Sequence, residues 1–182
     1  RDLHRRAMPM FCLVIAATAL AADRNVDLAS SSIFATFAQE HALVETQFRN
    51  FNGTVSYDAA RPEATRAVLS VDVASLDVGD AASSAELRKP AWFDSARYPQ
   101  AVFRSSAIRP GAPGHFDATG TLTIKDRAQT ITVSVTVQSA GQANIFDGAF
   151  EISRKAYGIG DSSWDGLLDD VVKVRFHLLA GP

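Results

Sequence analysis

The sequence has few of the residues that most often carry out chemistry in proteins. Among its 182 residues there is a single cysteine, Cys12, and there are four histidines, at positions 4, 41, 115 and 177. One cysteine excludes a disulfide within the chain and a thiolate metal cluster. The histidines are widely separated in the sequence, which is more typical of strand ends and surfaces than of metal ligation.

Sequence motifs of enzymes are also missing. No G-x-S-x-G turn is present, and "GIGDSSWDG" lacks both the spacing and the lysine of a phosphate-binding loop. The stretch "DSSWDGLLDDVV" has the first acidic positions of a calcium loop, but Val172 stands where the loop requires a bidentate glutamate. We therefore expect neither an enzyme nor a metal site.

The charge of the chain excludes one large class of partners. Its formal net charge is −2, and the 18 lysines and arginines are scattered instead of clustered. Nucleic-acid binding depends on a basic surface that neutralises phosphates. No nucleic-acid partner is expected.

The first 22 residues differ from the rest and predict a cleaved signal peptide. A cationic "RDLHRRA" is followed by an apolar run and then by the small residues of "ALAAD". The competing interpretation is a membrane anchor, but the apolar run has about 15 residues and a spanning helix needs about 20. We expect one mature domain, residues 23–182, in the periplasm or secreted.

From about residue 30 the sequence alternates between apolar and polar residues, which predicts an all-β fold of about eight strands. In 115–124 and 130–137 one face is apolar and the other is rich in threonine and serine. Turn signals such as "RPGAPG", "KDRA" and the Asn52–Gly53 pair separate the segments. Short connections favour antiparallel pairing, in an extended barrel or a sandwich. The other predicted strands are "SSIFATFAQ", "FRNFNGTVSYD", "RAVLSVDVAS", "QAVFRSSAI", "GAFEISRK" and "VVKVRFHLL".

One segment predicts a short helix. "DAASSAELRK" follows Asp80 with helix-forming residues, and Pro90 ends the helix near Lys89. The bulky pair Trp92 and Phe93 comes directly afterwards. We expect this helix near one end of the barrel, where the two aromatic side chains close the opening.

The inward face of the predicted barrel is almost entirely apolar. Alternation alone leaves two possibilities open, a core packed by its own side chains and a cavity that holds a hydrocarbon chain. The predicted ligand-binding residues are Phe37, Phe51, Leu69, Val71, Phe93, Phe103, Leu122, Ile124, Val133, Val135, Phe150, Ile152, Val174 and Phe176.

The order of motifs resembles the YceI-like family of exported, lipocalin-like proteins associated with polyisoprenoid binding. The resemblance covers residues 24–180 and rests on "AELRKPAWFDSARYPQAVFRSSAI", "FDATGTLTIKDRAQTITVSV" and "FEISRKAYGIGDSSWDG", in this order. The chain departs from the family at Thr46 and Asp126, where glycine is usual.

The resemblance implies an antiparallel barrel that holds a long isoprenoid, such as a polyprenyl chain or a quinone tail, with no cofactor. It favours binding, sequestration or transport over catalysis. The alternatives are an enzyme with Asp or Ser at the barrel mouth and a quinone-handling partner of a membrane cytochrome. A transient membrane contact and a homodimer are further partners left open. Arg154, Lys155 and Tyr157 are candidates for contacting the polar head of the lipid.

Overall fold

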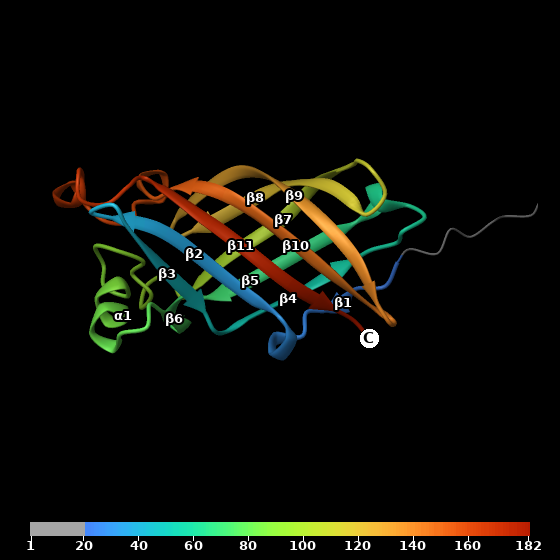
Figure 1. Ribbon diagram of the computed structural model, residues 1–182, viewed down its shortest axis with the longest axis horizontal. Helices are drawn as coiled ribbons and strands as arrows, with labels where there is room; N and C mark the ends of the chain where they lie inside the picture. Colours follow the sequence, from blue (N-terminus) through green and yellow to red (C-terminus); the bar gives the residue numbers. More distant parts are fainter. Residues whose placement is uncertain (1–20) are drawn as a thin grey trace, which may run out of the picture.

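Segments of alternating residues form long antiparallel strands in the computed structural model, which describes residues 21–182 (Figure 1). In 115–124 the apolar residues are buried and none of the three threonines between them is. The predicted all-β fold and the extended barrel are confirmed. The predicted signal peptide lies almost wholly outside the described residues.

Residues 21–182 contain eleven strands, two of which are only two residues long, so nine strands build the wall where about eight were expected. The strands are β1 Arg24–Asn25, β2 Ser32–Gln39, β3 Ala42–Phe48, β4 Phe51–Ser56, β5 Arg66–Asp72, β6 Leu76–Asp77, β7 Gln100–Pro110, β8 His115–Ile124, β9 Arg127–Ala140, β10 Ala143–Ser153 and β11 Val171–Ala180. The helices are α1 Ala81–Leu87 and the short 3₁₀ turns η1 Leu28–Ser30, η2 Pro62–Ala64, η3 Val73–Ser75, η4 Lys155–Tyr157 and η5 Ser162–Trp164.

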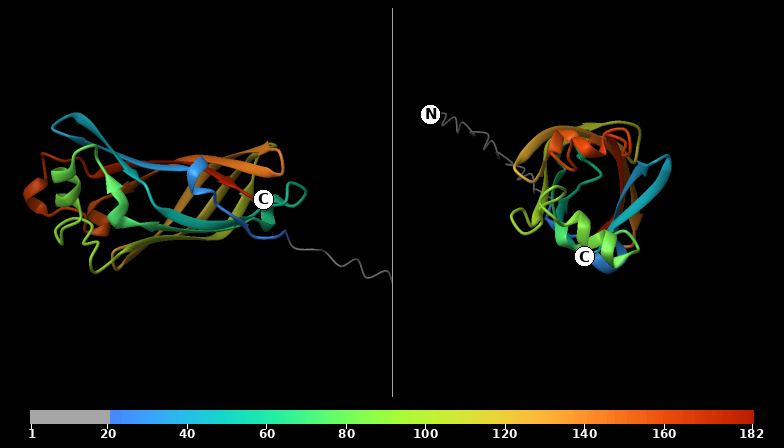
Figure 2. Two further views of the ribbon diagram at one scale, coloured as in Figure 1. Left: turned by 90° about the horizontal axis from the view of Figure 1, so that it is seen from below. Right: turned by 90° about the vertical axis from the view of Figure 1, so that its left-hand side faces the viewer.

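All strands belong to one sheet, which curls around a lumen (Figure 2). The strand order is β1-β4-β5-β7-β8-β9-β10-β11-β2-β3-β6, and every pairing is antiparallel. A sandwich, the other arrangement that alternation allows, would need two sheets. Because the described strands form a single curled sheet, the fold is a barrel and not a sandwich.

A short segment near the start of the described chain joins the two sides of the sheet. Asn25 pairs with Thr54 of β4, and the amide of Asp27 donates to the carbonyl of Leu179 over 2.8 Å. Residues 24–27 therefore hydrogen bond to β4 on one side and to the last strand on the other. This seam closes the barrel at the end away from α1 (Figure 1).

The expected turn at Asn52–Gly53 is wrong, because both residues lie inside β4 and pair with Ser70 and Leu69 of β5. A Cβ on Gly53 would lie 2.5 Å from the carbonyl oxygen of Val68, so no larger residue fits. Glycine marks a close approach of two strands here, not a turn.

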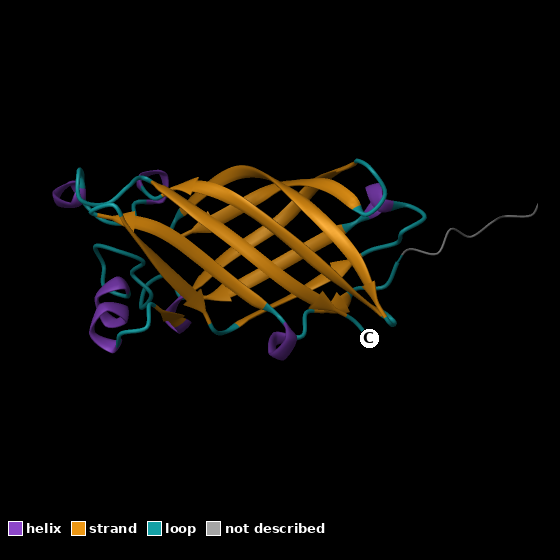
Figure 3. Cartoon of the chain, viewed as in Figure 1, coloured by secondary structure: helices purple, strands orange, loops and turns teal. Residues whose placement is uncertain are grey.

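The helix forms where its capping signals predict it. The carboxylate of Asp80 accepts a hydrogen bond from the amide of Ser83 over 2.9 Å, which satisfies one of the free amides of the first turn. The helix ends at Leu87, two residues before the predicted end. It lies at one end of the barrel (Figure 3), which we call the helix end.

Gly120 of β8 is expected to be required for the close approach of β7 and β8. A Cβ there would lie 2.3 Å from the carbonyl oxygen of Arg104 and 2.6 Å from the Phe103 ring. We expect Gly120→Ala to cost about 3 kcal/mol, because a backbone atom of β7 must move. Urea unfolding measures the loss. Gly111→Ala is the control, since its nearest neighbour would lie at 3.5 Å, and an equal loss in both variants would contradict the prediction.

Candidate functional site

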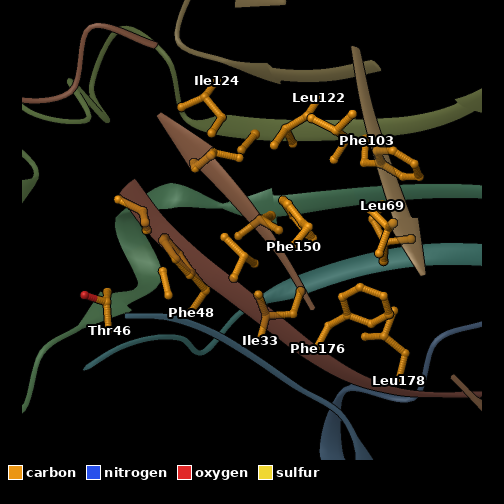
Figure 4. Close-up of a pocket in the computed structure, with 18 of the residues that line it drawn as sticks. Ile33, Thr46, Phe48, Leu69, Phe103, Leu122, Ile124, Phe150, Phe176 and Leu178 are labelled. Atoms are coloured by element: carbon orange, nitrogen blue, oxygen red, sulfur yellow. The ribbon is translucent and has the colours of Figure 1, made fainter. Parts of the chain in front are cut away.

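The barrel encloses an apolar cavity of about 210 Å³ that runs between its walls (Figure 4). Packed protein interiors have few voids larger than one water molecule. Apolar cavities of about 150 Å³ stay dry and take up molecules of the size of benzene. The interior of this barrel is therefore not simply a packed core, although that possibility was open from the sequence.

The structure brings together thirteen of the fourteen predicted ligand-binding residues in the lining of this cavity. Phe51 is the exception. It is 4 % exposed and packs in the buried cluster beside the cavity, outside the lining. The thirteen are Phe37, Leu69, Val71, Phe93, Phe103, Leu122, Ile124, Val133, Val135, Phe150, Ile152, Val174 and Phe176.

Large side chains lie in the cavity because small residues make room beside them. A Cβ on Gly148 of β10 would lie 2.4 Å from the Phe176 ring, which occupies the space over this glycine. Phe103 covers Gly120 in the same way, and Leu69 covers Gly53. These side chains lie against the barrel wall, which leaves the lumen open.

The end away from α1 is closed by three aromatic rings. The Tyr57 ring stacks on Phe116 with centroids 6.3 Å apart and meets Phe146 edge to face at 5.6 Å. Phe116 and Phe146 also line the cavity, so they form its floor. The three rings give the cavity an apolar floor, which suits the apolar end of a ligand.

The helix end is covered by two loops, residues 88–99 and 154–170, which we call the end cap. The amide of Gly160 donates to the carbonyl of Ala91 over 2.8 Å, which joins the loops. The Trp92 and Trp164 rings lie 5.1 Å apart. Phe93 packs edge to face on Phe48 at 6.0 Å. Trp92 and Phe93 therefore close the barrel as expected, with Trp164 added to them.

Arg154 holds the second loop of the end cap together from inside the protein. Its side chain donates to the carbonyls of Ile159, Leu168 and Asp169 over 3.1 to 3.2 Å and to the carboxylate of Asp165 over 3.1 Å. Only 1 % of Arg154 is exposed. Its donors are engaged within the chain, which leaves no support for the expected contact with a lipid head.

The other two candidates for that contact are engaged as well. The Tyr157 hydroxyl donates to the Leu122 carbonyl over 3.3 Å, and burial raises the pKa of its phenol. Lys155 pairs with Asp165 at 3.2 Å, and hydrogen bonds from Lys155 and Arg154 hold the pKa of Asp165 below its usual value. All three residues stabilise the end cap.

The polar residues of the lining are few. Apart from the indole of Trp92, only Arg154, Thr65 and Thr46 carry polar side-chain groups among the residues that line the cavity. The Thr65 hydroxyl donates to the Pro62 carbonyl over 2.6 Å. The Thr46 hydroxyl has no hydrogen-bond partner among the described residues.

Several lining residues were not predicted. Thr46 and Phe48 belong to β3, which the sequence does not mark as a separate strand because "HALVETQF" alternates poorly. Ile108 lies beyond a bulge between Ser105 and Ala107 that reverses the inward face of β7. A bulge has no reliable sequence signal, so alternation alone could not have placed Ile108.

Within residues 21–182, no group of three or more His, Cys, Asp or Glu side chains could hold a metal ion. None of the helices in this range is sufficiently long and hydrophobic for a membrane span.

The fold and its lumen place this chain among the lipocalin-like antiparallel β-barrels. The model of the YceI-like domain matches residues 25–180, and the chain belongs to the YceI-like family. A UPF0312 protein of Azotobacter vinelandii is 27 % identical over 156 aligned residues, and the match covers 81 % of this chain and 81 % of that protein.

Solved structures share the same barrel. BcnA of Burkholderia cenocepacia is 39 % identical, with a TM-score of 0.83 over 85 % of this chain and 99 % of BcnA. A polyisoprenoid-binding domain of Saccharophagus degradans, implicated in plant cell wall breakdown, is 17 % identical, with a TM-score of 0.72 over 88 % of this chain and 98 % of that domain. At 17 % identity, the similarity to the Saccharophagus domain shows a shared fold only.

Proposed function

We propose that this protein binds a long-chain isoprenoid lipid in the lumen of its barrel and sequesters or carries it across an aqueous compartment. The observation that carries the proposal is the cavity itself, about 210 Å³ between walls that are apolar almost throughout. An apolar lumen closed by aromatic side chains favours a ligand that is itself nearly all hydrocarbon.

The hydrophobic effect supplies the affinity that such a ligand needs. Each buried methylene contributes about 0.8 kcal/mol, so an isoprene unit of five carbons contributes up to about 4 kcal/mol. Polar contacts are then not required for tight binding. Affinity should rise with tail length until the lumen is full.

The YceI-like membership and the described role of the Saccharophagus domain support an isoprenoid over other hydrocarbons. The lining does not favour the enzymatic alternative, because catalysis needs polar groups that converge on the cavity. Arg154, the one cation in the lining, is fully engaged in the end cap. The proposal therefore concerns a binding protein.

We place the protein in the periplasm or outside the cell, as the leader predicts. An isoprenoid is insoluble in water, so a carrier is needed where such a lipid leaves a membrane. Within this proposal, the end cap is the part of the barrel that opens, because its two loops are joined through few backbone hydrogen bonds.

The test is organic extraction of the purified protein followed by mass spectrometry. We expect an isoprenoid in near-stoichiometric amount. Titration with all-trans prenyl alcohols of 10 to about 40 carbons should then give affinities that rise and level off as the lumen fills. Repeated recovery of empty protein that binds none of these alcohols would remove the proposal.

A further inference from the structure

Thr46 differs from the other polar residues of the lining because its hydroxyl makes no hydrogen bond to the described chain. Its side chain is only 3 % exposed and lines the cavity. No hydrogen bond to its Oγ1 is present within residues 21–182, whereas the Thr65 hydroxyl is bonded to Pro62. Among the described residues no fully buried side-chain oxygen or nitrogen lacks a hydrogen-bond partner, so the Thr46 oxygen keeps a small accessible surface and is open to a partner from outside the chain.

Thr46 also lies at a particular place in the barrel. It pairs with Ala35 of β2, and two residues later Phe48 packs on Phe93 of the end cap. On its other side β3 pairs with β6 only through Gln47 and Phe48. Thr46 therefore lies in the wall next to the end cap, at the edge of the group of apolar side chains in Figure 4.

We propose that the Thr46 hydroxyl binds the oxygen of the ligand's head group, which selects isoprenoids with a neutral head. This inference rests on the proposed function and deepens it. The tail would extend from Thr46 along the lumen toward Phe116 and Phe146, which close the far end. A hydroxyl both donates and accepts, so it fits the alcohol of a prenyl alcohol or the carbonyl of a quinone.

The lining disfavours a phosphorylated head. A phosphate needs several donors or a cation to replace its water. Arg154 is the one cation of the lining, and three carbonyls and the Asp165 carboxylate already engage it. A single hydroxyl in an apolar wall suits an uncharged oxygen.

The variant that tests this is Thr46→Val, which keeps the shape of the side chain and removes the hydroxyl. The probes are geranylgeraniol, a quinone with the same tail, geranylgeranyl phosphate, and the matching hydrocarbon without oxygen. We expect the unsubstituted protein to prefer the alcohol or the quinone over the hydrocarbon, and the phosphate to bind more weakly than either. Whichever of alcohol and quinone binds more tightly identifies the natural head.

In Thr46→Val we expect about a threefold to tenfold loss of affinity for that head, the effect of one hydrogen bond, and no change for the hydrocarbon. Thr46→Ser should restore the preference. Thr119→Val is the matched control, because Thr119 lies outside the cavity lining and its hydroxyl is hydrogen bonded to the Thr132 hydroxyl over 2.9 Å, and it should leave the preference among heads unchanged.

An unchanged preference in a folded Thr46→Val protein would overturn this inference and leave the proposed function standing. Equal binding of the phosphate and the alcohol would overturn it as well. Failure of the unsubstituted protein to bind any of the four probes would overturn the proposed function, and the inference with it.

Discussion

Replacing Ala118 by phenylalanine is expected to reduce isoprenoid binding by about 100-fold or more while the barrel stays folded. Ala118 lines the cavity from β8, between Phe116 and Gly120 on the inward face. A phenyl ring added there occupies space that the lipid tail needs. Overpacking normally costs about 1–3 kcal/mol, but a cavity of about 210 Å³ accepts the ring with less strain.

The measurement is titration with geranylgeraniol, together with thermal unfolding to show that the variant is folded. Thr121→Phe is the matched control, because Thr121 is on the same strand and its side chain is exposed on the outer face. It should bind as the unsubstituted protein does. Full binding by a folded Ala118→Phe protein would show that the ligand does not occupy the lumen.

Replacing Arg154 by methionine is expected to lower the free energy of unfolding by about 3–5 kcal/mol. The change leaves the carbonyls of Ile159, Leu168 and Asp169 without the donor that satisfies them at the helix end. A buried acceptor that loses its donor costs about 1–3 kcal/mol, and three carbonyls lose theirs here. The melting temperature should fall by about 10 °C.

Arg49→Met is the control for the loss of an arginine that pairs with a carboxylate. Arg49 bonds Asp77 at 2.8 Å, but more than half of its side chain is exposed, and surface pairs contribute about 0–1 kcal/mol. Urea unfolding of both variants separates the two roles. Equal losses would mean that the buried contacts of Arg154 do not hold the end cap together.

The sequence predicts the walls of the barrel well because the physical signal is repeated many times. In β8 and β9 threonine alternates with valine, leucine or isoleucine, and the pleat of a strand places those residues on opposite faces. A cavity between the walls cannot be seen in this pattern. A packed core and an open lumen need the same alternation, and the difference depends on how Phe103 and Phe176 lie over Gly120 and Gly148.

The end cap was predicted in part. Trp92 and Phe93 stand out in the sequence as large apolar residues after a helix, and they do cover the barrel. The sequence singles out Arg154 only as a candidate for contacting a lipid head and Thr46 only as a departure from the family, and neither observation predicts the contacts that the two residues make. Their roles depend on burial and on partners far away in the sequence, and only the folded chain shows both.

The seam of the barrel has a consequence for the time at which a lipid can be loaded. Asp27 bonds Leu179, and Gly181 bonds Asn25, so the wall is complete only when residues near both ends of the described chain have met. Contacts between residues so distant in sequence form late, because the entropy of closing a long loop must first be overcome. The wall therefore closes only after residues 179–181 have been synthesised, and under the proposed function a lipid would be enclosed after that step.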